Sequence, residues 1–275
     1  MDYWALQKQV VNKVLCAGDL LAAEWSRPGG PRGHGDKADI DREIEEQLRA
    51  DLLGLLSCDF WGEETGHQLS GDEFCWVVDP NDGTSDFLRG HCGSALSVGL
   101  LHNAVPVLGV VYAPVTDGGP DCISWAKGQG SLLRNGKAVR FRLDHLDLEP
   151  GTKVLVSMAA RSKPELNTEL CAPADFSPMP SIAYRLARVA VGDAIACASL
   201  VPVSAHDIAA GHALLIGAGG VILNEDGEPI SYESETCLLR ASLRCFGGAS
   251  RACLKLVQRD WERLFYSGDP LQHGL

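Results

Sequence analysis

Two aspartates lie close together in the segment 79–84, which reads D-P-N-D-G-T. The apolar run at 74–78 predicts a buried strand that ends at Asp79 and Pro80, because proline cannot donate to a strand ladder and has a fixed φ. Asp79 and Asp82 are three residues apart across this proline-stiffened turn, so both carboxylates can point at one spot.

The residues after Asp82 add groups that suit a phosphate. Gly83 leaves room for a backbone N–H to approach a ligand closely, and the hydroxyl of Thr84 or Ser85 can cap the helix that follows. A strand end with two carboxylates, free N–H groups and a hydroxyl suits a divalent cation together with a phosphate. On this motif alone, an Asp-rich surface turn is an equally good interpretation.

Three further acids lie at the ends of predicted elements. Asp41 lies in the first turn of a helix that apolar residues at i, i+4 spacing indicate over 40–52, and Glu63 ends a short apolar segment. Asp207 begins a helix predicted over 205–217. Each acid has an ordinary alternative role, which is favourable interaction with a helix dipole for Asp41 and Asp207 and a solvated turn for Glu63.

Composition argues against several classes of protein. The chain of 275 residues has a formal net charge of -12 and no Lys/Arg stripe, which argues against a nucleic-acid polymer as partner. No apolar run approaches the roughly 18 residues that a membrane span needs, and the N-terminus lacks the pattern of a signal peptide. We therefore expect a soluble, cytoplasmic protein with no membrane partner. The ten cysteines form no C-x-x-C pair, so we expect reduced thiols and no zinc site.

The elements that must position these acids divide at a polar, proline-bearing stretch, 144–151. The first part, 1–146, is predicted to pair helices with a largely antiparallel sheet, and the second part, 147–275, alternates strands and helices as a smaller α/β half. In the first part we expect helices at 3–26 and 40–52, a mobile loop or lid at 27–35, strands at 93–101 and 105–112, and an Asn-Gly hairpin at 131–139. In the second part we expect strands at 153–158, 194–198, 220–224 and 243–246, helices at 162–170, 182–191, 205–217 and 250–264, and a proline-rich loop at 172–180.

Five short motifs occur in a fixed order along the chain. They are G-E-E at 62–64, D-P-N-D-G-T at 79–84, L-G-V-V-Y-A-P at 108–114, the stretch 128–136, and H-D-I-A-A-G at 206–211 followed by Gly219 and Gly220. In this order they resemble the inositol monophosphatase superfamily of Mg-dependent, lithium-sensitive phosphatases, which includes 3'(2'),5'-bisphosphate nucleotidases. The resemblance covers most of the chain. It implies an α/β (α+β) fold, a layered αβαβα sandwich with the site between the two parts, and a homodimer.

The resemblance also implies roles for the acids. Position by position, it implies a first Mg²⁺ on Glu63, Asp79 and the main-chain carbonyl of Asn81, a second on Asp79, Asp82 and Asp207, and a third, looser ion supported by Asp41. The N–H groups of Gly83 and Thr84 would receive the phosphate, with Ser85 beside them. The implied reaction is hydrolysis of a small phosphorylated alcohol by metal-activated water, oriented by Thr84 with Asp41 as a base relay and without a phosphoenzyme.

Elementary electrostatics favours the same site. Unit charges about 4 Å apart repel by roughly 4 kcal/mol at an effective dielectric constant near 20. Several carboxylates therefore cannot stay ionised in one pocket without cations. An acid-only ligand set suits hard Mg²⁺ better than Zn²⁺.

The substrate side departs from the family pattern. Where animal inositol monophosphatases place a glutamate that contacts inositol hydroxyls, this chain has S-L-V-P-V at 199–203, and His206 replaces the family's tryptophan. Arg161, Tyr184 and Arg185 lie on segments that match the family's substrate side, and we expect substrate contacts there.

We expect an inositol phosphate or a sugar phosphate as the substrate. The first alternative is a 3'(2'),5'-bisphosphate nucleotidase that acts on 3'-phosphoadenosine 5'-phosphate, and a lower-ranked one is a non-catalytic protein that binds a phosphate ligand. A nucleotide-cofactor enzyme is disfavoured because the glycine cluster at 217–220 follows a predicted helix and precedes a strand, the reverse of the dinucleotide-binding order.

Overall fold

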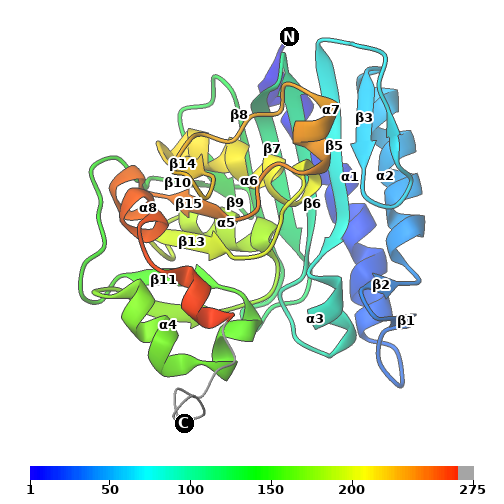
Figure 1. Ribbon diagram of the computed structural model, residues 1–275. Coiled ribbons are helices and arrows are strands. Elements are labelled where there is room, and N and C mark those ends of the chain that lie inside the picture. Colours follow the sequence, from blue (N-terminus) through cyan, green and yellow to red (C-terminus); the bar gives the residue numbers. More distant parts are fainter. Residues whose placement is uncertain (266–275) are drawn as a thin grey trace.

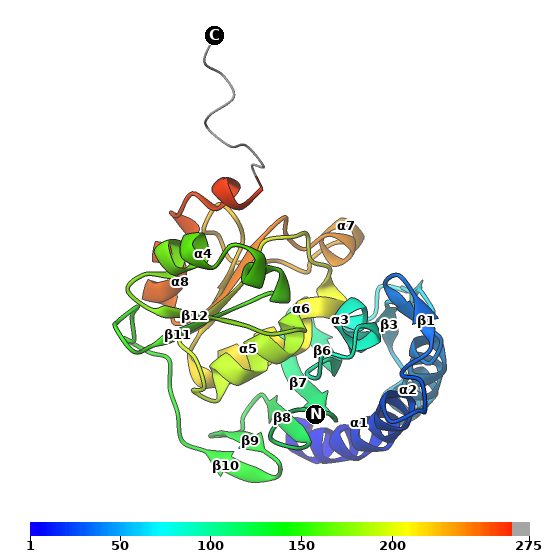
Figure 2. The ribbon, with the colours of Figure 1, turned by 90° about the horizontal axis from the view of Figure 1, so that it is seen from below.

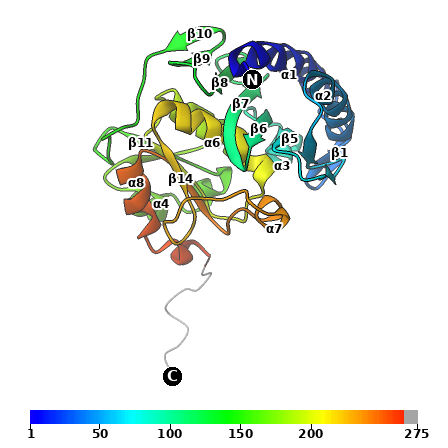
Figure 3. The same cartoon turned by 90° about the horizontal axis from the view of Figure 1, so that it is seen from above.

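Two amphipathic helices cover one face of a large sheet. The computed structural model describes residues 1–265, and it begins with α1 (Tyr3–Trp25) and α2 (Asp41–Leu55). Between them, where we expected a mobile loop, lies a small two-stranded sheet of β1 (Gly33–His34) and β2 (Lys37–Ala38). Both helices lie along the same face of the sheet (Figure 3). Their apolar stripes are buried in a core shared with the sheet, as their sequence period predicts. These stripes consist of Val10, Val14, Ala17, Leu21, Ile44, Leu48 and Leu52.

The large sheet has eight strands in the order β10-β9-β8-β7-β6-β5-β3-β4. Its members are β3 (Asp59–Gly62), β4 (His67–Gln68), β5 (Phe74–Asp82), β6 (Ala95–His102), β7 (Val105–Ala113), β8 (Asp121–Ala126), β9 (Leu132–Arg134) and β10 (Lys137–Val139). Neighbouring strands are antiparallel except β3 and β5. The predicted antiparallel sheet is therefore confirmed, and Asn135 and Gly136 form the hairpin turn with φ of 49° and 75°. Strand β8 was not predicted.

A second sheet of five strands lies beyond two helices that separate it from the first (Figure 1). Its order is β12-β11-β13-β15-β14, with parallel pairs at β11–β12 and β11–β13. The strands are β11 (Lys153–Val156), β12 (Asp175–Pro178), β13 (Ala196–Ser199), β14 (Val221–Leu223) and β15 (Cys245–Gly248). Helices α5 (Ile182–Ala190) and α6 (Ala205–Ala218) fill the space between the sheets, and α4 (Pro164–Cys171) and α8 (Ser250–Val257) cover the outer face (Figure 2). The layers thus follow the expected αβαβα order.

Three further expectations about local structure were wrong. Strand β5 continues through Pro80 to Asp82, because its register against β6 shifts between Asp79 and Asp82 and the proline sits in this irregularity. The proline-rich stretch 172–180 contains β12, which tolerates proline because it is an edge strand. The predicted helix 250–264 is divided into α8 and a 3-10 turn, Trp261–Leu264. A short helix, α7 (Glu235–Leu239), was not predicted.

Buried apolar residues from both parts of the chain form a shared core. It contains Val77 and Val111 from the large sheet together with Leu186 and Phe246 from the second part. The expected boundary between the parts lies in the segment that joins β10 to β11. No helix within residues 1–265 has the length and apolar character that would carry it across a membrane.

Glycines allow α6 to lie directly on the large sheet. A Cβ at Gly109 would lie 2.3 Å from the carbonyl oxygen of Ala210, and one at Gly99 would lie 3.0 Å from the amide nitrogen of the same residue. This close approach matters for the site, because α6 begins two residues before Asp207.

We predict that Gly109→Ala lowers the free energy of unfolding by about 1–3 kcal/mol, because the added methyl group would push α6 from the sheet. Urea denaturation measures this change. Gly54→Ala is the matched control, since Gly54 lies in α2 with no heavy atom within 4 Å of an added Cβ. It should raise the free energy of unfolding by up to about 1 kcal/mol through helix propensity. Equal effects of the two substitutions would contradict the packing argument.

Candidate functional site

Four carboxylates from three distant segments meet near the end of β5. Oxygens of Asp79, Asp82 and Asp207 lie within 4.8 Å of one another, and an oxygen of Glu63, one of Asp79 and a ring nitrogen of His206 form a second such group. Asp79 belongs to both groups. We refer to Glu63, Asp79, Asp82 and Asp207 as the acidic cluster.

The turn after Asp79 is held by a buried network that includes Asp41. The Asn81 amide N–H donates to Asp79 Oδ1 at 2.8 Å, and Asn81 Nδ2 donates to Asp41 Oδ1 at 2.9 Å. The Thr84 hydroxyl lies 2.7 Å from the Asn81 carbonyl oxygen and 3.3 Å from Asp41 Oδ2. Asp41 is only 2 % exposed. A favourable interaction with the helix dipole alone would not need such burial. The network joins the start of α2 to the β5 turn.

Asp82 connects the β5 turn to α5 in the second part of the chain. Its Oδ2 accepts hydrogen bonds from the Ser181 hydroxyl and from the Ala183 amide, both at 2.6 Å. Gly83 has a φ of 94°, and a Cβ there would lie 3.0 Å from the Ser181 amide nitrogen. Sequence reasoning missed Ser181 and Ala183. A serine before a predicted helix signals only an N-cap, and Ser181 is also the N-cap of α5.

Asp207 occupies the helix start that its sequence position predicts and also belongs to the acidic cluster. It lies in the first turn of α6, where its Oδ2 accepts a hydrogen bond of 2.5 Å from the Ser204 amide in a capping box. Its Oδ1 lies 3.9 Å from His206 Nε2. The His206 Nδ1 atom is buried without a hydrogen-bond partner among the described residues.

Burial and mutual repulsion oppose ionisation of these acids. Burial raises the pKa of Asp79, and Glu63 and Asp82 raise it further. Burial also raises the pKa values of Asp41, Asp82 and Asp207, each to about 6. The Glu63 residue is exposed as a whole, but surrounding protein atoms desolvate its carboxyl group. This desolvation, together with the negative charge of Asp207, raises the pKa of Glu63 to about 8. The Arg185 guanidinium lowers the pKa values of Asp82 and Asp207, but one cation cannot balance four carboxylates.

The donor set fits divalent metal ions. Carboxylate oxygens dominate the acidic cluster, and hard cations such as Mg²⁺ and Ca²⁺ prefer such ligands. Asn81 Oδ1 adds an independent observation, because it is buried and has no hydrogen-bond partner in the described part of the chain. A buried amide oxygen without a partner is costly unless a donor or a cation satisfies it.

The residues expected on the substrate side have different positions. Arg185 is 5 % exposed and donates from Nε to the Ser181 carbonyl at 3.3 Å and from Nη1 to the Ala198 carbonyl. It also lines a cavity of about 170 Å³ together with residues 199–201. The Tyr184 hydroxyl donates to Asp121 at 2.7 Å, outside the acidic cluster. Arg161 is exposed on the 3-10 turn Met158–Ser162, and Ser85 is half-buried in the first turn of α3 (Thr84–Leu88).

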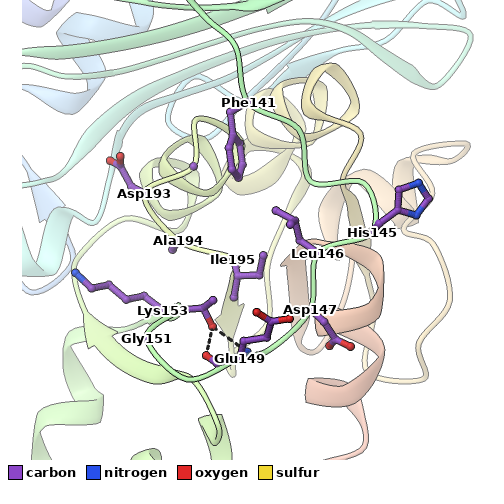
Figure 4. Close-up of a pocket in the computed structure, with 12 residues that line it drawn as sticks. Phe141, His145, Leu146, Asp147, Glu149, Gly151, Lys153, Asp193, Ala194 and Ile195 are labelled. Atoms are coloured by element: carbon purple, nitrogen blue, oxygen red, sulfur yellow. Dashed lines mark hydrogen bonds between the residues drawn. The ribbon is translucent and has the colours of Figure 1, made fainter.

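A cavity of about 310 Å³ lies elsewhere, between the segment 141–153 and the turn before β13 (Figure 4). Phe141, Leu146 and Ile195 point into it, whereas His145 and Asp193 point away. None of its lining residues belongs to the acidic cluster. It is therefore not the place where the predicted chemistry would occur.

Comparison with known proteins matches residues 12–256 to the inositol monophosphatase family. The chain is 31% identical over 179 residues to inositol monophosphatase 2 of Solanum lycopersicum, in a stretch that covers 61% of this chain and 66% of that protein. It is 29% identical over 170 residues to the 3'(2'),5'-bisphosphate nucleotidase CysQ of Escherichia coli strain K12, covering 62% and 66%. The matched stretches thus span just under two thirds of these relatives. The structure of an inositol monophosphatase from Anabaena superposes with a TM-score of 0.71 at 22% identity, over 98% of this chain and 99% of that one. This similarity shows a shared fold.

We predict that Asp79→Asn changes the thermal stability in opposite directions with and without Mg²⁺. In EDTA the variant should melt at the same temperature as the native protein or higher, because one repelling carboxylate is gone and the asparagine oxygen still accepts from the Asn81 amide. Mg²⁺ at about 100 times its Kd should stabilise the native protein by about 2.7 kcal/mol, and the variant much less.

Thermal melts at increasing MgCl₂ concentration measure both effects. Asp117→Asn is the control, because Asp117 is an exposed acid outside the acidic cluster, and it should retain the full response to Mg²⁺. Equal stabilisation of native protein and Asp79→Asn by Mg²⁺ would rule out Asp79 as a ligand.

Proposed function

Because the chain belongs to the inositol monophosphatase family, we propose that it is a phosphomonoesterase that hydrolyses a small phosphorylated alcohol, an inositol phosphate or a sugar phosphate. The observation that carries this proposal is that two sets of possible metal-ligand atoms share Asp79. Both lie beside the turn of Gly83 and Thr84. A phosphoryl-transfer site needs such an arrangement, because cations must neutralise both the acids and the phosphate.

We propose that the site binds two or three Mg²⁺ ions. Glu63, Asp79 and the main-chain carbonyl of Asn81 would hold the first, Asp79, Asp82 and Asp207 the second, and Asp41 would support a third. The predominance of carboxylate oxygens in the acidic cluster supports this assignment, and the Asn81 side-chain oxygen Oδ1 is a further buried acceptor in the same turn without a partner among the described residues. When bound, such ions stabilise negative charge on phosphoryl oxygens and make water a better nucleophile.

The residues of the β5 turn have separate tasks in the proposed reaction. The N–H groups of Gly83 and Thr84, with Ser85 beside them, receive the phosphate. The Thr84 hydroxyl orients the attacking water, and the nearby Asp41 carboxylate takes up the proton through it, since Thr84 Oγ1 lies 3.3 Å from Asp41 Oδ2. No side chain is phosphorylated in this scheme. The first part of the chain, 1–146, supplies most of these groups, and the second part, 147–275, supplies Asp207 and the groups that face the alcohol.

The alcohol part of the substrate lies nearest to Arg185 in this proposal. Arg185 is buried next to Asp82 and Asp207, and its guanidinium donates to the backbone carbonyls of Ser181 and Ala198. No ion pair of its side chain occurs within residues 1–265. When cations neutralise the two aspartates, the guanidinium is left without a balancing charge. This observation favours a second candidate function, a 3'(2'),5'-bisphosphate nucleotidase, whose substrate carries a second anionic group. Tyr184 and Arg161 remain predictions as substrate contacts.

We predict that Thr84→Val lowers kcat/KM by about 10²–10⁴-fold, because the hydroxyl that relays the proton is lost. Phosphate release from inositol 1-phosphate, sugar phosphates and 3'-phosphoadenosine 5'-phosphate with Mg²⁺ measures the effect and distinguishes the two candidate substrate classes. Thr84→Ser is the control and should retain most of the activity, and circular dichroism checks the fold of both variants. Native activity in Thr84→Val would disprove the relay. Phosphate binding without turnover of any of these esters would favour the non-catalytic alternative.

We further propose, as the family resemblance implies, that the enzyme is a cytoplasmic homodimer. We also propose that lithium inhibits the enzyme. Lithium is expected to compete at the second cation position, so activity should fall across millimolar LiCl and recover with added Mg²⁺. Equal concentrations of NaCl are the control for ionic strength. Activity that stays flat across the LiCl series would contradict the assignment of that position, and sedimentation analysis tests the dimer.

A further inference from the structure

Glu45 is a buried carboxylate without a cation partner that lies outside the acidic cluster. It belongs to α2 and is 0 % exposed. Its Oε1 accepts hydrogen bonds of 2.6 Å from both the Thr65 amide and the Thr65 hydroxyl, and its Oε2 accepts one of 3.0 Å from the Glu64 amide. In residues 1–265 no salt bridge involves Glu45. A fully buried carboxylate is costly unless it accepts hydrogen bonds. The donors to Glu45 all belong to one short turn.

That turn, 62–65, follows β3 and contains Glu63. A second residue of α2 also binds this turn. Arg49 Nη1 donates to the Thr65 hydroxyl at 3.1 Å and to the Thr65 carbonyl at 3.3 Å. Gly62 permits the close approach from the other side, since a Cβ there would lie 2.2 Å from Glu45 Oε1. The Glu45 carboxylate therefore holds the two residues directly after Glu63 by hydrogen bonds, and Gly62 lets it lie close to the residue directly before Glu63.

We propose that Glu45 is a positioning residue for the cation site, which holds the turn 62–65 so that Glu63 faces Asp79. Glu63 has an exposed side chain, and its oxygen lies within 4.8 Å of ligand atoms of Asp79 and His206. An exposed glutamate has several rotamers, and fixing its side chain on a cation costs conformational entropy. A turn that already directs Glu63 toward Asp79 reduces this cost. Loss of Glu45 therefore weakens cation binding without removing any ligand. This inference rests on the proposed cation site.

Asp59 offers a matched control at the other end of the same strand. It is 5 % exposed, and it accepts from the Ser70 amide at 2.7 Å, the Ser70 hydroxyl at 2.6 Å, and the amides of Gly71 and Asp72 at 3.1 and 3.2 Å. The chemistry is the same, a buried carboxylate that holds a turn by backbone amides and one hydroxyl. The turn it holds contains no member of the acidic cluster.

The test compares Glu45→Gln with Asp59→Asn by calorimetric titration with Mg²⁺ and by thermal melts in EDTA. Both variants should melt at lower temperature than the native protein, because an amide cannot accept from all the donors that the carboxylate served. Only Glu45→Gln should weaken Mg²⁺ binding, by about 10–100-fold, as loss of groups that orient metal ligands does. A purely structural role predicts lower melting temperatures with an unchanged Kd for Mg²⁺ in both variants.

Thr65→Val is a milder variant that keeps the test decisive if Glu45→Gln does not fold. It removes one of the hydrogen bonds to Glu45 and should weaken Mg²⁺ binding by a smaller factor, and Thr65→Ser should restore the native Kd. An unchanged Kd in Glu45→Gln or Thr65→Val, or equal weakening in Asp59→Asn, would overturn the proposal while leaving the cation site intact. If the native protein itself does not bind Mg²⁺, the proposed cation site fails and this inference fails with it.

Discussion

Repulsion between buried carboxylates is the constraint on which the rest of this structure depends. Asp79, Asp82 and Asp207 have oxygens within 4.8 Å of one another, and burial raises the pKa of each. Stability alone would not favour such an arrangement, because carboxylates at this distance repel one another and the repulsion costs free energy. The surrounding structure must therefore hold them in place. Backbone amides do so for Asp82 and Asp207, which accept from the amides of Ala183 and Ser204 respectively.

The site also explains how the two parts of the chain are joined. Asp82 is in the large sheet, yet the Ser181 hydroxyl and the Ala183 amide that donate to it belong to the segment that begins α5. Asp207 reaches the same place because α6 packs against glycines of β6 and β7. The interface thus does two things at once, since it buries the shared core and completes the acidic cluster. A change in the angle between the sheets would separate Asp207 from Asp79.

Much of the fold could be predicted because it follows from local patterns. Helices α1 and α2 have clear apolar periods, and the Asn135-Gly136 turn has the residues that its positive φ angles require. Errors occurred where a tertiary context overrides a local signal. Pro80 was expected to end its strand, but a register shift accommodates it, and the prolines of 172–180 are compatible with an edge strand. The hydrogen bond of the Tyr184 hydroxyl to Asp121 is likewise a tertiary contact that no local pattern signals.

The order of the acidic motifs along the chain was sufficient to identify the family and the fold class, because each motif keeps its local geometry wherever the chain folds. What only the tertiary structure decided is which groups support the acids: Ser181 and Ala183 for Asp82, and Glu45 for the turn that contains Glu63. These supporting residues carry no motif of their own, and a serine or glutamate on a helix looks ordinary in sequence. Their role comes from hydrogen bonds between segments that lie far apart along the chain, and such bonds exist only once the layers have packed.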